Sequence, residues 1–333
     1  MTALPRDELR NLGIAAAILL VAPLPVMGSS YYLGVLIHVV VFAMFAVALN
    51  IVFGETDQLF LFMGGLAGIG AYGTALFTNW FGLSAWLTMI AAALFAGLVG
   101  LVVSWISARR NFTVVLISIL TLNLQLVITE IMVGARDLTG GSTGFTYEEY
   151  FSLEAIGGVL GLGPELLIYY ISLILLMVIL LVYVWLVNAR FGVAFDAIRE
   201  DELAAASIGI DVVRYKVIAG FLAAFVFGLV GPFYAREASY ILPSAFTFLT
   251  VDVLVLIVLI VGGLRTTLGP IVGAVIVVAI EEILGATLTN WRTAIFGILL
   301  IALFLYFRRG VVRFAADRLS TLDGVGSGGE SRG

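Results

Sequence analysis

The sequence predicts an all-α integral membrane protein with about ten transmembrane helices. Of its 333 residues, 62% are hydrophobic and only 12% are charged, whereas roughly a quarter of the residues in a soluble domain are charged. Apolar runs of about twenty residues, the length of helix that crosses the hydrocarbon core, recur along the chain. Because a helix satisfies its own backbone hydrogen bonds, these runs are expected to cross the membrane as helices.

The apolar runs define the predicted spans and leave two polar loops between them. Asp7 and Glu8 precede the first run, which is therefore expected to be a retained helix and not a signal peptide with a basic start. The ten runs are 11–28, 32–53, 59–79, 83–107, 112–134, 164–188, 216–235, 247–263, 268–287 and 290–307. Residues 1–307 thus form the predicted membrane domain, and the Gly- and Ser-rich tail 308–333 is expected to be disordered.

Basic residues orient these spans. With ten spans and both termini inside, only Arg136, Arg236 and Arg292 of the 17 basic residues fall outside, which leaves 14 on the inner side. This asymmetry is the one that the positive-inside rule requires. Both termini and the loop 189–216 are therefore predicted to be cytoplasmic, and the loop 135–163 to be external.

The residue inventory argues against several classes of function. The chain contains no cysteine and a single histidine, His38, so zinc sites and thiol nucleophiles have no basis here. Its only lysine, Lys216, follows a tyrosine and forms no phosphate-binding loop. No basic patch with interleaved aromatic residues indicates nucleic acid. We therefore expect a protein that is not an enzyme and that carries no cofactor or metal.

The loop 190–216 is the one long polar segment on the cytoplasmic side. It is predicted to form a short amphipathic helix with Phe195, Ile198 and Ala205 on one face and charged residues on the other, ending near Gly209. The charged residues are Asp196, Arg199, Glu200, Asp201 and Glu202. The spacing alone is equally compatible with a solvated connector between two membrane helices.

Several blocks of the sequence carry a resemblance to a known family. In order and spacing, Arg190-Phe191-Gly192, Ala197-Ile198-Arg199-Glu200, Gly209-Ile210 and Arg214-Tyr215-Lys216 resemble the cytoplasmic loop of LivM-type permease subunits of branched-chain amino acid ABC importers. Further similar blocks are Gln58-Leu59 with Gly68-Ile69-Gly70-Ala71-Tyr72, Leu138-Thr139-Gly140-Gly141, and Gly262-Gly263-Leu264 with Gly269-Pro270. The resemblance covers nearly the whole chain.

The resemblance implies a type II importer-like fold with two inverted five-helix halves. It implies a multi-pass protein of the prokaryotic plasma membrane, with two separate ATP-binding cassette subunits and an external solute-binding protein as partners. A second permease subunit would complete the pathway, and a heterodimer is favoured over a homodimer. The residues that it assigns to ATPase coupling are Phe195, Ala197, Ile198, Arg199, Glu200, Glu202, Ala205 and Gly209.

Two departures from the family pattern concern the coupling loop and the solute. Glu202 lies one place earlier than the acidic residue of the broader importer pattern. Bulky apolar residues, Phe60 to Met63, replace the small polar run that usually follows Gln58-Leu59. The solute is therefore open between a leucine-like amino acid, another amino acid, and urea or a short amide.

A polar stripe on the fifth span is the candidate solute pathway. Ser118, Thr121, Gln125 and Thr129 follow one another at steps of three, four and four residues, so they share one helix face, with Glu130 beside them. The alternative is hydrogen bonding between helices, at about 0.6 kcal/mol per contact. We favour the pathway, and we keep Glu130 as the best site candidate among the carboxylates of the predicted spans.

Other carboxylates lie in or near the late spans. Asp252, Glu281 and Glu282 are costly in hydrocarbon unless they are paired or hydrated. Arg265 and Arg292 lie near the ends of the same helices. Ion pairing with them is therefore a structural role for the three carboxylates, and it is as well supported as a functional role.

A competing hypothesis is a secondary transporter or channel for a small polar solute such as urea or an amide. Against it stand the scarcity of ionisable residues in the predicted spans and the lack of a recognisable pair of broken helices, which coupling-ion sites often use.

Overall fold

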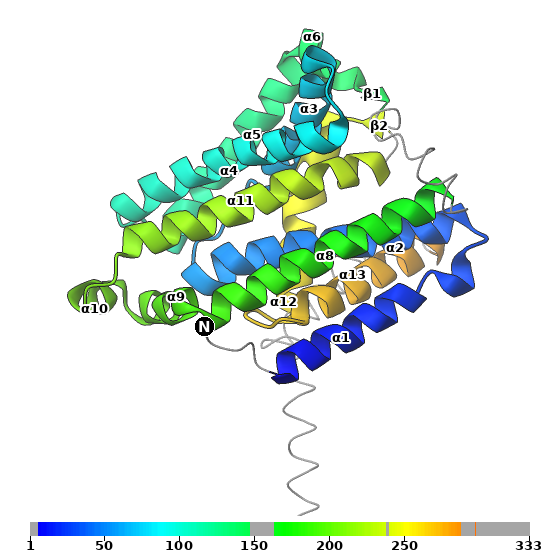
Figure 1. Cartoon of the computed structure of the whole chain (residues 1–333). Coiled ribbons are helices and arrows are strands. Elements are labelled where there is room, and N and C mark those ends of the chain that lie inside the picture. The colour runs from blue at the N-terminus through cyan, green and yellow to red at the C-terminus, as the bar shows by residue number, and fades with distance from the viewer. Residues whose placement is uncertain (1–5, 147–162, 238–239, 288–296, 298–333) are drawn as a thin grey trace, which may run out of the picture.

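The computed structural model describes residues 6–146, 163–237, 240–287 and 297. The described chain is helical apart from one short strand pair (Figure 1). Six of its helices are long and apolar enough to cross a membrane. They correspond to α1 (Arg6–Val21) extended by η1 (Leu24–Val26), α2 (Ser30–Leu49) extended by the π-helical turn η2 (Asn50–Gly54), α4 (Ala85–Arg109), α5 (Val114–Gly134), α8 (Pro164–Asn188) and α11 (Val212–Glu237).

Each of the first nine predicted spans coincides with a helix. The remaining three are α3 (Met63–Phe81), α12 (Val253–Gly262) and α13 (Gly269–Thr287). The predicted tenth span, 290–307, and the tail 308–333 lie outside the described residues except for residue 297. The all-α class is therefore confirmed, and the count of ten spans stays a prediction.

Small residues let three helices approach closely. Helix α11 packs against α3 and α4, and Gly220, Ala224 and Gly228 repeat at four-residue steps along its contact face. A Cβ added to Gly70 of α3 would lie 1.9 Å from the carbonyl oxygen of Gly228. Such contacts are the means by which membrane helices associate without a hydrophobic driving force.

Two segments that connect long helices meet at the buried start of α3. Residues 57–62 separate α2 from α3 and have no regular secondary structure. Between α11 and α12 lie β2 (Tyr240–Ile241), η5 (Pro243–Phe246) and the π-helical turn η6 (Phe248–Asp252). Both segments lie between helices that the sequence predicts as separate spans, so neither is a break within one helix, and the expectation that the chain lacks a pair of broken helices stays a prediction. The first connection falls at residues 57–62, and the third span begins at Met63, a few residues later than predicted.

The loops at the two ends also form ordered structure. The loop between α8 and α11 contains two helices, α9 (Arg190–Glu200) and α10 (Glu202–Ser207), because Asp201 caps α10 by accepting from the backbone N–H groups of Leu203 (2.8 Å) and Ala204 (3.0 Å). The loop at the other end of α5 includes α6 (Arg136–Thr139), η3 (Gly141–Thr143) and β1 (Phe145–Thr146), which pairs antiparallel with β2. In Figure 1, α9 and α10 lie together at one end of the molecule, away from α6.

Candidate coupling site and interior polar bridge

The buried face of the α9–α10 pair holds it to its own chain. Phe195, Ile198 and Ala205 are each at most 2% exposed, and the ring of Phe195 lies 6.1 Å from that of Tyr215 in an edge-on contact. The expectation that this apolar face is exposed for another subunit is therefore wrong. The three residues share one face, as their spacing predicts, but this face packs inward because Tyr215 of α11 supplies an aromatic partner.

The opposite surface carries three exposed apolar side chains. Val193, Leu203 and Ile208 are 73%, 83% and 74% exposed. Sequence analysis missed them because they stand among charged residues and belong to no continuous stripe. An isolated exposed apolar residue needs no explanation, but three on one short segment outside the membrane-spanning helices indicate a contact surface. We call Val193, Leu203 and Ile208 the outer apolar patch.

The other residues assigned to coupling divide between the two surfaces. Glu200 and Gly209 are exposed, whereas Ala197, Arg199 and Glu202 are half-buried. Gly209 adopts a positive φ of 89°, which ends the short helical segment. Glu202 pairs with Lys216, which is 3% exposed.

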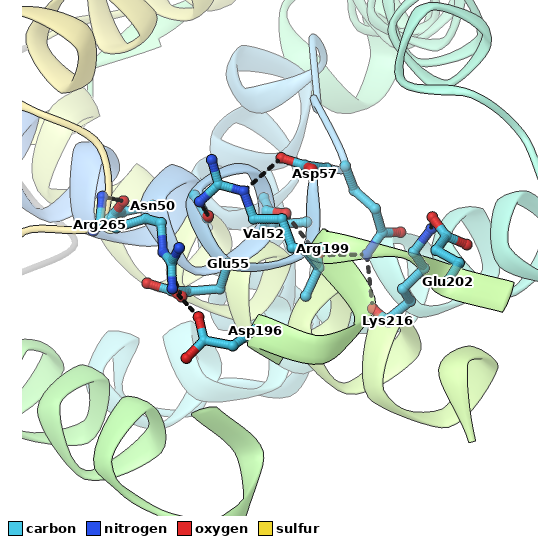
Figure 2. A network of polar contacts seen from close by, with 12 residues as sticks. Asn50, Val52, Glu55, Asp57, Asp196, Arg199, Glu202, Lys216 and Arg265 are labelled. Carbon is cyan, nitrogen blue, oxygen red and sulfur yellow. Dashed lines mark hydrogen bonds and ion pairs between the residues drawn. The ribbon is translucent and has the colours of Figure 1, made fainter. Parts of the chain in front are cut away.

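Two arginines attach α9 to the segments around it (Figure 2). The Nε atom of Arg199 lies 3.3 Å from Oδ1 of Asp57, and its Nη1 atom donates to the carbonyl oxygen of Gly54 at 3.1 Å. Arg265, in the turn between α12 and α13, pairs with Asp196 of α9 and lies 3.5 Å from Oε2 of Glu55. We call these contacts the arginine clamp.

Asn50 and Tyr183 support the inner end of the clamp. The Oδ1 atom of Asn50 accepts from the backbone N–H of Arg265 at 2.8 Å, and its Nδ2 atom donates to the hydroxyl of Tyr183 at 2.9 Å. Tyr183 in turn donates to Glu55 at 2.8 Å. Burial raises the pKa of Glu55 above its ordinary value, while the Tyr183 hydrogen bond and the Arg265 charge oppose that rise.

Thr121 and Gln125 of α5 form hydrogen bonds with backbone groups of residues 57–62, of the first turn of α3 and of η5. Both side chains are fully buried. Gln125 accepts from the N–H of Gly65 and donates to the carbonyl oxygen of Phe246, each at 2.6 Å. Thr121 accepts from the N–H of Leu61 at 3.0 Å. These two residues therefore join elements within the chain, and their assignment to the solute pathway stays a prediction.

The rest of the polar stripe is more open. Ser118 and Thr129 are half-buried and donate to carbonyl oxygens of their own helix, those of Val114 (2.8 Å) and Gln125 (2.9 Å). Glu130 is exposed at the outer surface of α5. The five predicted pathway residues thus lie on one helix but differ in exposure, from the fully buried Thr121 and Gln125 to the exposed Glu130.

Asp252 caps the buried start of α3. Its carboxylate, which is fully buried, accepts from the N–H groups of Met63 (2.6 Å) and Gly64 (3.1 Å). A negative charge at a helix N-terminus is favoured by the helix dipole. The alternative in which Arg265 pairs with Asp252 is therefore wrong, because Arg265 pairs with Glu55 and Asp196 instead. Together with Thr121 and Gln125, Asp252 forms what we call the interior polar bridge.

Glu281 and Glu282 lie at a separate cavity of about 350 Å³ between α2 and α13, with His38 and Tyr31. Tyr31 donates to Glu282, and Arg292 lies outside the described residues. Within the described part of the chain, no three His, Asp or Glu side chains are close enough together to hold a metal ion.

Comparison with known proteins identifies the family. The family described as branched-chain amino acid transport system / permease component matches residues 31–304. The high-affinity branched-chain amino acid transport system permease protein LivM of Escherichia coli K12 is 24% identical, over 96% of this chain and 79% of the relative. The Salmonella typhimurium LivM protein is 23% identical over the same shares.

A third relative is a probable branched-chain amino acid transport permease protein LivH of Methanocaldococcus jannaschii, which is 22% identical over 75% of this chain and 79% of the relative. No solved structure matches. Because the family match spans most of the sequence, from α2 to residue 304, this chain belongs to the permease component family of branched-chain amino acid transport systems.

Proposed function

We propose that the protein is a transmembrane permease subunit of an ABC importer for branched-chain or related amino acids, and that separate ATPase subunits dock on α9 and α10. Family membership supports the transport role. The observation that carries the docking site is the outer apolar patch, Val193, Leu203 and Ile208, on a helix pair whose other face is buried in the permease. A rigidly seated helix with an apolar outer surface can both bind a partner and transmit its movement.

The coupling residues then have two kinds of role. Phe195, Ile198 and Ala205 seat the helix pair, while Arg199 and Glu202 join it to neighbouring segments through Asp57 and Lys216. The exposed residues Glu200 and Gly209 lie at the rim of the docking surface, with Ala197 half-buried beside them.

Two inverted five-helix halves are the architecture that we propose for the complete chain. Two connecting segments occupy corresponding positions. Residues 57–62 join the second helix of the first half, α2, to the third, α3, and the segment with β2, η5 and η6 joins the second helix of the other half, α11, to the third, α12. Inverted repeats are common in transporters and place broken helices at matching positions. The exposed face of α5, with Ser118 and Glu130, would then meet a second, sister permease along the solute pathway.

Cytoplasmic termini complete the proposed topology, in which a solute-binding protein meets the external side near residues 135–163. The native chain has no cysteine, and Ser142 and Ser207 are both exposed. A cysteine at Ser142 should react with an impermeant thiol reagent added to intact cells, and a cysteine at Ser207 should react only after lysis. The reverse pattern would overturn the orientation.

The alternative is a secondary transporter or channel for urea or an amide, whose coupling-ion sites often use exposed helix ends in the interior. Here the interior start of α3 is occupied by the chain itself. Asp252 and Gln125 already bind the first three N–H groups of α3, those of Met63, Gly64 and Gly65. A coupling-ion or solute site would need such groups to face an open cavity, so the importer is the better supported function.

The test uses charge placed in the outer apolar patch. Leu203→Asp and Ile208→Asp should reduce co-purification of the co-expressed ATPase subunits and abolish solute uptake, with normal insertion of the permease, because both side chains are exposed. Glu200→Gln on the same surface is the matched control and should cost less than about 1 kcal/mol of binding. Full ATPase binding and normal uptake in both aspartate variants would contradict the docking site. Ile198→Asp is unsuitable, because Ile198 is buried.

A further inference from the structure

We propose that residues 57–62, which we call the connector, transmit the movement of α9 to α5. This inference rests on the proposed function, in which ATPase subunits grip α9 and α10. One end of the connector is held by Arg199 of α9 and the other by Thr121 of α5. The connector therefore forms a direct link between the cytoplasmic helix pair and the helix that carries the candidate pathway residues.

At its cytoplasmic end, the connector is attached to two elements. Arg199 binds both the side chain of Asp57 (3.3 Å) and the carbonyl oxygen of Gly54 (3.1 Å). The next residue, Gln58, is fully buried and donates to the backbone carbonyl oxygen of Lys216, at the start of α11, at 3.0 Å. Movement of α9 relative to α2 must therefore either displace the connector or break these bonds.

At its interior end, the connector is attached to α5 and packed on both sides. The N–H of Leu61 donates to Thr121 at 3.0 Å. Phe60 and Phe62 are fully buried, with ring centroids 5.1 Å apart. The six connector residues belong to no helix or strand. The N–H groups of Asp57 and Gln58 donate to the carbonyl oxygens of Phe53 and Val52 in α2, and the side-chain contacts with Arg199 and Thr121 hold the two ends. The connector therefore follows the elements to which its ends are bonded.

Strained backbone marks both places where the arginine clamp is attached. Asp57 has a φ of 53° and Arg265 a φ of 59°, the left-handed region that non-glycine residues rarely adopt. Such conformations persist only where surrounding contacts hold them, and they cluster at switch regions. Contacts with α9 help to hold them, since Asp57 binds Arg199 and Arg265 binds Asp196, while Asn50 and Phe53 hold the backbone N–H groups of Arg265 and Asp57.

Arg265 provides a second connection from the same helix. Asp196 and Arg199 lie three residues apart on one face of α9, and Asp196 leads to Arg265 in the turn between α12 and α13. Figure 2 shows the two arginines on either side of Glu55. One face of α9 thus holds both the connector and that turn, so a single movement of the helix acts on both halves of the chain.

The test is a double-mutant cycle in the complete transporter. Arg199→Gln keeps the aliphatic stem, and Asp57→Asn keeps a residue type that tolerates a positive φ. Each single variant should lower the solute imported per ATP hydrolysed by about fivefold or more, while ATPase subunits still co-purify. The double variant should be no worse than the more affected single variant, because both substitutions remove one contact. Arg110→Gln, the same substitution at an exposed arginine in the turn between α4 and α5, is the control and should leave the transport ratio unchanged.

Two results would overturn the proposal that the connector transmits movement. One is an unchanged transport ratio in both single variants, and the other is multiplicative losses in the double variant. A purely structural staple would instead lower thermal stability and leave the transport ratio intact. If Arg199→Gln or Asp57→Asn fails to assemble, Arg199→Lys gives a milder test of the same contact, because it keeps a positive charge opposite Asp57 but loses the fork that also reaches the Gly54 carbonyl. Failure of the ATPase subunits to bind the wild-type permease would instead refute the proposed function. Failure of the connector proposal alone would leave this binding intact.

Discussion

The interior polar bridge and the arginine clamp hold the two ends of one region, residues 54–65, by different chemistry. In the bridge, the side chains of Thr121, Gln125 and Asp252 are fully buried and bind backbone groups. In the clamp, Arg199 and Arg265 are each 31% exposed, and their partners Asp57 and Asp196 are 39% and 58% exposed. One end is closed to solvent, and the other is open to it.

This difference indicates a fixed end and an adjustable end. In the buried bridge, a broken hydrogen bond leaves a polar group without water to replace its partner, which costs about 1–3 kcal/mol. A partly exposed ion pair can exchange its partner for water, and its net contribution is about 0–1 kcal/mol. We therefore expect the bridge to determine whether the permease folds, and the clamp to determine how movement passes through it.

The largest effect is expected at Asp252. Asp252→Ala leaves the N–H groups of Met63 and Gly64 without an acceptor, so unfolding should become easier by about 2–5 kcal/mol. The measurement is the thermal stability of purified permease in detergent. Asp252→Asn, which retains one carbonyl oxygen, should lose less. Equal stability of wild type and Asp252→Ala would show that the cap on α3 is not needed.

A smaller loss is expected at Gln125. Gln125→Leu removes the partners of the Gly65 N–H and the Phe246 carbonyl, and Thr121→Leu removes the partner of the Leu61 N–H, so each should destabilise by about 1–3 kcal/mol. Both side chains are fully buried and hydrogen-bonded, so assembly of these variants should be measured together with their stability. Thr129→Val, which loses a bond only to its own helix, is the matched control.

Uptake by stable variants of the open part of α5 separates structure from pathway. Ser118→Leu and Glu130→Gln should keep wild-type stability because neither side chain is buried, and they should slow uptake if the stripe lines the pathway. Normal uptake by both would leave α5 with a structural role alone.

The contribution of the arginine clamp to stability should depend on the salt concentration, whereas that of the interior polar bridge should not. Arg199→Ala should reduce stability by about 1 kcal/mol or less at low ionic strength, and Arg265→Ala should cost more because its partner Glu55 is buried. The difference from wild type should shrink in 1 M salt, where the screening length falls to about 3 Å. Gln125→Leu, measured alongside, should show the same loss at both salt concentrations. A salt-independent loss in the arginine variants would mean that their packing matters more than their charge.

The smallest effect concerns Glu55, the buried acceptor of the clamp. Its raised pKa means that the folded chain holds this proton more tightly than the unfolded chain does. Stability therefore falls as pH rises from the ordinary glutamate value through the raised one. Glu55→Gln lacks this loss, so its stability relative to wild type should increase with pH over that window. A constant difference from acid to neutral pH would contradict the burial effect.

The sequence by itself determined the membrane class, the positions of nine apolar helices, the existence of an amphipathic element in the loop 190–216, and the family. These features are local or statistical. A run of twenty apolar residues predicts a helix wherever it lies, and helical spacing groups Phe195 with Ile198 whatever they contact. The described structure agrees at each of those helices.

Only the tertiary structure decided which face of α9 is exposed, at which residue α3 begins, and which polar residues form contacts. Phe60 to Met63 have apolar side chains that a helix could accommodate. The groups that bind this segment outside a helix lie far away in sequence: Leu61 and Thr121 are 60 residues apart, and Met63 and Asp252 are 189 apart. The outcome depends on which backbone groups lack a partner after the helices have packed. A local pattern cannot contain that information, because the cost of an unpaired N–H exists only once folding has removed the water around it.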